Sequence, residues 1–173
     1  DIYSTSVSSS SLIGIRFDTT PGAVIKKCKI HDLLCSATGT IVGIQAYGGS
    51  SDTEKYQVYN NEVYLETGAA TTTGIVTGID YYGYTSNSCD VYFNSVYIGG
   101  SNATGGTSYA FLKRVGVTTL NVQDNVFMNA RSNGTGTGKH YAIGYTSTST
   151  TTLNLNRNDY YATGTGGVLG VWS

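Results

Sequence analysis

The sequence predicts an all-β solenoid, in which short parallel strands wind into about five coils of ~32 residues each. Three observations support this prediction. One cassette of apolar and polar residues returns five times. In segments upstream of it, apolar residues alternate with other residues, as in short strands. No segment has apolar residues at the 3.6-residue period of a long helix. We expect one domain spanning 1–173, with a serine-rich lead-in at 1–10.

The cassette is an apolar residue, two further residues, Asn or His, one residue, and then two large residues. Its copies occupy 28–34, 58–64, 91–97, 122–128 and 155–161. A polar anchor recurs at its centre every 30 to 33 residues, a period typical of stacked repeats. The anchors are His31, Asn61, Asn94, Asn125 and Asn158.

Short alternating segments precede each cassette, at 14–17, 43–46, 78–81, 110–112 and 142–145. Rich in Ile, Val and Tyr, they read as strands, and each cassette would add two more strands with a bend at its anchor. Stacking then predicts inward apolar rows. One row is Ile15, Ile44, Ile79, Phe111 and Ile143; a second is Leu33, Val63, Val96, Phe127 and Tyr160; a third is Cys28, Val58, Val91, Val122 and Leu155.

The anchors predict an inward asparagine ladder. Asn tolerates left-handed backbone angles at a tight bend and bonds nearby peptide groups. Stacked on itself, its amide can donate to one neighbouring coil and accept from the other, which satisfies buried polar groups. We expect His31 to end this ladder at its N-terminal side, which is a structural rather than a catalytic role.

Composition narrows the classes of partner. Charged residues make up 12% of the chain and the net charge is −1, so there is no basic field for nucleic acid or anionic lipid. Weak charge repulsion favours self-association. No apolar run approaches membrane-spanning length, and the three cysteines lack metal-ligand spacing. We therefore predict neither nucleic-acid binding nor membrane insertion.

The V-x-x-N-x-V core at 58–63 and 91–96 resembles the right-handed parallel β-helix of the pectate-lyase-like superfamily. The stretch 153–170 is similar to large secreted β-helix proteins of Bacteroidota-type bacteria. The resemblance implies a right-handed coil and an extracellular or cell-surface location. The chain starts at Asp1 and stops in an apolar run, and we expect it to be a piece of a longer secreted precursor. This fold hosts lyases, hydrolases, adhesins and scaffolds, so it does not decide the function.

An enzyme of this superfamily would need clustered acids. A lyase would hold Ca²⁺ with several carboxylates, and a hydrolase would use two or three Asp on neighbouring coils. The predicted outward rows offer only Asp32 and Glu62 as neighbours, either a weak Ca²⁺ site or two solvated acids. Nucleophile and phosphate-loop signatures are absent. The sequence therefore predicts no catalytic residue, no cofactor beyond that Ca²⁺ candidate, and favours a protein that is not an enzyme.

Outward aromatic residues form the most informative surface. If the inward rows are right, Leu34, Tyr64, Tyr97, Met128 and Tyr161 point outward as one stripe, with Tyr59 and Tyr92 as a shorter second stack. Such a stripe can pack against another domain or subunit, bind sugar rings, or only stabilise the solenoid by cross-strand stacking.

Three positions match glycosylation patterns. Asn102 and Asn133 each begin an N-x-[ST] acceptor, and Thr19 lies in an Asp-Thr-Thr triplet that resembles the O-glycan acceptor of secreted Bacteroidota proteins.

We expect from all this a non-catalytic extracellular structural or adhesive module that packs against itself or other surface proteins, including end-to-end joining into fibres. The alternative is a polysaccharide-binding module or carbohydrate-active enzyme. There Tyr64, Tyr97 and Tyr161 would stack on sugars, and the enzyme would add Asp32 and Glu62.

Overall fold

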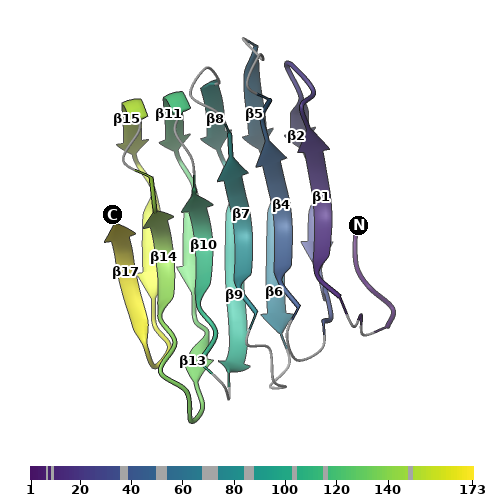
Figure 1. Cartoon of the computed structure of the whole chain (residues 1–173), viewed down its shortest axis with the longest axis vertical. Helices are drawn as coiled ribbons and strands as arrows, with labels where there is room; N and C mark the ends of the chain where they lie inside the picture. The colour runs from purple at the N-terminus through teal and green to yellow at the C-terminus, as the bar shows by residue number, and fades with distance from the viewer. Residues whose placement is uncertain are drawn as a thin grey trace.

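A computed structural model describes the chain except residues 7, 9, 36–38, 50–53, 68–73, 84–87, 103–104, 115–116 and 148–149. At 67, 102, 117–118 and 150–151 only the backbone is described. The described residues form strands and no helix, and the strands lie in three parallel sheets (Figure 1).

The three sheets take one strand each from every passage of the chain. The first contains β1 (Leu12–Asp18), β4 (Ile41–Tyr47), β7 (Val76–Tyr82), β10 (Ser108–Lys113), β14 (His140–Tyr145) and β17 (Gly167–Trp172). The second contains β2 (Val24–Lys26), β5 (Lys55–Tyr59), β8 (Ser88–Tyr92), β11 (Val117–Gln123) and β15 (Thr150–Asn156). The third contains β3 (Lys29–His31), β6 (Glu62–Thr67), β9 (Ser95–Asn102), β12 (Val126–Asn129) and β16 (Asp159–Ala162), and β13 (Ser132–Asn133) pairs with β9.

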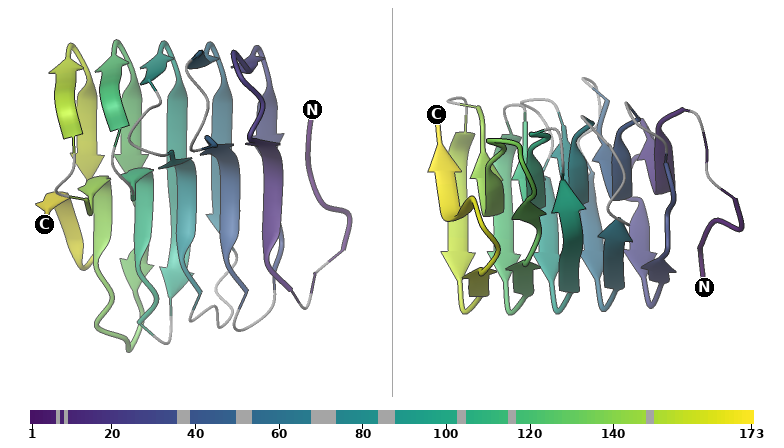
Figure 2. Two further views of the ribbon diagram at one scale, coloured as in Figure 1. Left: turned by 45° about the horizontal axis from the view of Figure 1, so that its top comes forward. Right: turned by 90° about the horizontal axis from the view of Figure 1, so that it is seen from below.

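The winding confirms the predicted fold class. In Figure 1 the chain ascends through the first sheet in front, returns behind it, and advances from right to left, which is a right-handed path. The two termini lie at opposite ends of the stack (Figure 2). The five strands of the second sheet are separated by four coil-to-coil steps. The six strands of the first sheet are separated by five such steps, so the solenoid makes between four and five turns, close to the five coils predicted.

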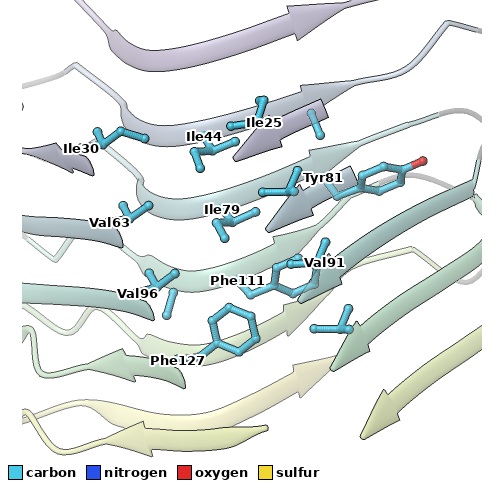
Figure 3. Packing of buried hydrophobic residues seen from close by; sticks show 14 of the residues in the cluster. Ile25, Ile30, Ile44, Val63, Ile79, Tyr81, Val91, Val96, Phe111 and Phe127 are labelled. Atoms are coloured by element: carbon cyan, nitrogen blue, oxygen red, sulfur yellow. The ribbon is translucent and has the colours of Figure 1, made fainter. Parts of the chain in front are cut away.

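The core consists of apolar rows that face one another across the solenoid (Figure 3). The row of Ile15, Ile44, Ile79, Phe111 and Ile143 is confirmed by the strand register. In the other two rows the first member was wrong. Ile30, not Leu33, stands opposite Val63, and Ile25, not Cys28, stands opposite Val58. In the first coil, the inward residues therefore lie three positions earlier in the sequence than predicted.

A sharp bend joins the second and third sheets in every coil. The residue at this bend has a positive φ between 51° and 57°. The five bend residues are Lys27, Asn60, Phe93, Asp124 and Arg157. The residue that follows the bend turns into the solenoid, and in four coils it is an asparagine.

Small residues let the first and third sheets approach. A Cβ added at Gly43 would lie 2.5 Å from Val63 Cγ1 and 2.7 Å from the carbonyl oxygen of Gly78 in the next coil. Such distances are shorter than van der Waals contact, so this position accepts no side chain unless the backbone shifts.

Candidate functional site

The asparagine ladder runs through the corner between the second and third sheets. Asn61, Asn94 and Asn125 are at most 3% exposed, and Asn158 is half-buried. Each Nδ2 donates to the Oδ1 of the next anchor, at 2.9, 3.0 and 2.9 Å from Asn61 onward. Each Nδ2 also donates to a backbone carbonyl of the preceding coil. The buried amides are therefore satisfied by one another and by the backbone.

His31 does not end this ladder. The register places it opposite Tyr64 on the outer surface, and Cys28 occupies the corner position instead. The backbone N–H of Cys28 donates to Asn61 Oδ1 at 3.0 Å, as the N–H of Asn61 does to Asn94 Oδ1. The Cys28 thiol donates to the carbonyl of Lys26 at 3.3 Å, which reproduces the bond from Asn94 Nδ2 to Tyr92 O. A thiol thus replaces one of the amide's bonds in the first coil.

The aromatic stripe is assembled on the outside of the third sheet. The register aligns His31, Tyr64, Tyr97, Met128 and Tyr161, so His31 takes the place predicted for Leu34. The Tyr64 and Tyr97 rings stack with centroids 4.9 Å apart, and His31 stacks on Tyr3. Tyr64 and Tyr161 are 37% and 46% exposed. The hydroxyl of Tyr64 donates to Glu66, which raises its pKa to about 12.

A shallow groove of about 240 Å³ runs beside the stripe. Its lining is mostly apolar, with Val63, Val96, Val126 and Met128 next to the two stacked rings. Val126 is 39% exposed, so an apolar side chain points into solvent here. A lining this poor in hydrogen-bonding groups suits an apolar contact better than a ligand rich in hydroxyl groups.

The second stack also forms. The rings of Tyr59 and Tyr92 lie 4.7 Å apart and almost parallel, on the outside of the second sheet. Lys26 Nζ lies 5.7 Å from the Tyr59 ring centre. This stack and the stripe lie on different sheets, so they are separate surfaces.

The weak calcium candidate is not brought together as expected. Glu62 stands opposite Lys29, whose Nζ lies 3.7 Å from its carboxylate. Asp32 has a φ of 49° and contacts His31 Nδ1 at 2.7 Å. Their expected adjacency followed from the misaligned first cassette. Within the described part of the chain, no three His, Cys, Asp or Glu residues gather as metal ligands.

Other acids of the described region are held by cations. Asp80 is fully buried and accepts hydrogen bonds from Arg114 at 2.9–3.0 Å and from Gln45 at 2.8 Å. Burial raises the pKa of this carboxyl, and Arg114 opposes the shift. Asp124 forms an exposed pair with Arg157, with contacts of 2.7 and 2.8 Å.

A buried polar network surrounds His140, and no motif in the sequence predicts it. Ser108 and His140 are both completely buried. His140 Nδ1 lies 2.9 Å from Ser108 Oγ, and Nε2 lies 3.1 Å from Asn133 Oδ1. Because that Oδ1 can only accept, Nε2 carries the proton and Nδ1 accepts from the Ser108 hydroxyl. Asn129 completes the network by donating to Ser108 Oγ at 2.9 Å.

This network contains the serine and the histidine of a nucleophilic site, but the serine is not accessible to a substrate. With both side chains sealed from solvent, no substrate can reach the Ser108 oxygen. Burial and the nearby Arg131 lower the pKa of His140 to about 4, so the imidazole is neutral at physiological pH. The signal in the sequence was positional: Ser108 and His140 occupy a row that holds Ile41 and Val76 in the preceding coils.

The glycosylation candidates lie in different settings. Thr19 is exposed at the turn after β1, with a φ of 48°. The amide of Asn133 is engaged at both ends, since Nδ2 donates to Gly138 O at 2.8 Å and Oδ1 accepts from His140. A glycan there would displace those bonds. The side chain of Asn102 and the two residues after it lie outside the described residues.

No family model, curated protein or solved structure matches this chain. Among the described residues, no helix has the length and apolarity needed to cross a bilayer.

Proposed function

We propose that this solenoid is a non-catalytic structural or adhesive module, and that it contacts a second copy or another surface protein through the aromatic stripe. By the stripe we mean His31, Tyr64, Tyr97, Met128 and Tyr161. The observation that carries the proposal is the exposed Tyr64–Tyr97 stack beside an apolar groove. We place this module outside the cell on the sequence resemblance alone.

The rest of the described molecule supports a role without catalysis. Its one Ser–His pair is sealed, and Asp80, Asp90 and Asp124 are each held by a cation. Polar groups of the Asn ladder bind one another rather than facing a cleft. A rigid prism whose conspicuous apolar feature is on its outside is suited to presenting a surface.

The test is assembly as a function of concentration. Sedimentation velocity and electron microscopy of the purified chain should reveal oligomers or fibres that the double variant Y64S/Y97S loses. The matched control is Y47S/Y82S, which removes a similar stack of rings, 5.1 Å apart, from the first sheet. Equal assembly by both double variants would contradict the proposal.

Polysaccharide binding by the stripe is the alternative, and the same variants examine it. A glycan array on which the wild-type chain binds, and Y64S/Y97S does not, would favour a binding module over a self-associating one. Release of unsaturated products from pectin or alginate with Ca²⁺ would instead identify a lyase.

A further inference from the structure

A polar pocket lies at the corner where the second sheet turns into the third, one face away from the aromatic stripe. It has a volume of about 270 Å³. Its walls come from the adjacent strands β8 and β11 and from the bends that follow them (Figure 1). The lining residues are Asp90, Tyr92, Phe93, Asn121, Gln123 and Asp124.

Phe93 is the unusual member of this pocket. It occupies the bend position with a φ of 55°, where the neighbouring coils have Asn60 and Asp124. Asn and Asp tolerate this left-handed conformation, whereas a bulky aromatic residue is strained in it. Its side chain is nevertheless 56% exposed, so the strain is not offset by burial in the core. Strain that persists at an exposed position next to a pocket is a reason to look for a function.

Two rings form an apolar corner in the pocket. Phe93 meets Tyr92 edge to face, with centroids 5.5 Å apart and planes at 80°. Tyr92 is held in place from its other side by Tyr59, 4.7 Å away. A flat apolar face of a ligand can therefore lie on one ring while its edge meets the other.

The polar groups around these rings carry compensated charge. Asp90 lies 3.2 Å from Lys55 Nζ and accepts from Asn121 Nδ2 at 2.6 Å. Both oxygens of Asp124 accept from Arg157. Lys55 and Arg157 compensate the two carboxylates, so a cationic ligand would find no excess negative charge, and the lining has no cation of its own to bind an anionic ligand. The chemistry that fits is a neutral molecule with several hydroxyl groups, which can both donate to carboxylates and bond to the amides of Asn121 and Gln123.

The size of the pocket limits the ligand to one ring. Pockets for drug-sized ligands typically hold ~300–1,000 Å³. A pyranose combines an apolar C–H face for the aromatic corner with a rim of hydroxyls for the amides and carboxylates.

We propose that this pocket, built on Phe93 and Tyr92, is a binding site for a neutral saccharide ring. The site is separate from the stripe and does not rest on the contact function proposed above. It also differs from what the pectate-lyase-like resemblance would imply, because the lining has no cation to bind the carboxylate of an acidic sugar.

The experiment is saturation-transfer NMR on the whole chain with methyl glycosides of glucose, galactose, mannose and N-acetylglucosamine, and with galacturonic acid as the acidic arm. We expect at least one neutral sugar to bind with a dissociation constant in the millimolar range, and galacturonic acid not to bind. Phe93→Asn should weaken binding about tenfold, because it removes one ring contact.

Phe93→Asn also separates a ligand contact from a structural role. Because Asn suits the bend, the midpoint of thermal unfolding of this variant should rise by about 2–4 °C while its binding weakens. Tyr97→Ser, on the other face, is the matched control and should bind as the wild type does, whatever happens to assembly. The proposal is overturned if no neutral sugar binds, if galacturonic acid binds better, or if Phe93→Asn binds as tightly as the wild type. A fall in the midpoint, showing that the phenyl group is structural, would also overturn it.

Discussion

Two buried polar systems in this solenoid satisfy the same requirement in different ways. The asparagine ladder repeats one side chain at one corner, and each amide binds the next. The network around His140 occurs once, near the opposite ends of the third-sheet strands, and joins unlike side chains from β10, β12, β13 and β14. A repeated residue can thus propagate one polar interaction through the core, whereas a polar residue that occurs in only one coil must find all its partners locally.

The largest effect should come from breaking the ladder in the middle. Asn94→Ala removes the acceptor for the backbone N–H and Nδ2 of Asn61, and the donor to Val58 O. Leaving several buried groups unpaired should cost about 3–5 kcal/mol of unfolding free energy, measured by urea denaturation. Asn158→Ala, at the half-buried end, is the control and should cost about 1 kcal/mol. Asn158 makes the same set of bonds as Asn94, so equal losses would mean that burial does not set the cost of breaking the ladder.

The His140 network should be costly to break but cheap to replace. His140→Ala removes the imidazole bonds to Ser108 Oγ and Asn133 Oδ1 and leaves a cavity, and it should cost about 2–3 kcal/mol. The triple variant S108V/N129I/H140V copies the apolar residues that stand in these rows in the coil of β7–β9, Val76 and Ile98. It removes both partners of the Ser108–His140 and Ser108–Asn129 bonds and leaves unpaired only Asn133 Oδ1 and the two backbone groups that bond to Asn129, so it should lose less stability than His140→Ala, which also leaves a cavity. A triple variant as unstable as His140→Ala would show that the network is needed for folding.

Acid should weaken the network and spare the ladder. The pKa of His140 is about 4 in the folded chain and ~6.5 when unfolded, so the unfolded state binds the proton more tightly. Stability is therefore full above pH 6.5 and declines as the pH falls toward 4, by about 2 kcal/mol between pH 7 and pH 5. Urea titrations across this range measure the decline. The triple variant, which lacks this imidazole, should show a smaller slope, and an unchanged slope would contradict the assignment.

The smallest effect should come from a polar pair that also joins two coils but lies in solvent. Arg157→Gln breaks the contact with Asp124. Exposed ion pairs contribute little, so the urea midpoint should stay within experimental error at 0.5 M salt. A large loss there would mean that exposure does not separate this pair from the two buried systems.

The repeated system could be read from the sequence because its spacing is regular. Asn61, Asn94, Asn125 and Asn158 were found from their period alone, and their mutual bonds follow from amide chemistry. The first coil was misread because Cys28 replaces the amide, and His31 happens to stand 30 residues before Asn61. Aligning Ile25 with Val58 gives a spacing of 33 residues, which lies within the range of 31 to 33 residues in the other coils.

The single deviations could not be predicted in the same way. Ser108 and His140 are unusual only when their row is known, and their bonds to Asn129 and Asn133 depend on turns that no period specifies. Phe93 fits the cassette as an ordinary residue, and its strain depends on a bend angle that the sequence does not state. Periodicity predicted the scaffold, and the candidate binding pocket arises where the sequence departs from it.

Every amide of the Asn ladder points the same way. From Asn61 to Asn125, each Nδ2 donates one N–H to the next anchor, toward the C-terminal end of the stack, and each accepting Oδ1 faces the N-terminal end. The row is therefore a line of aligned dipoles, and the long axis of the solenoid is polar. A filament that continued this row from one molecule to the next could grow only head to tail, and its two tips would differ.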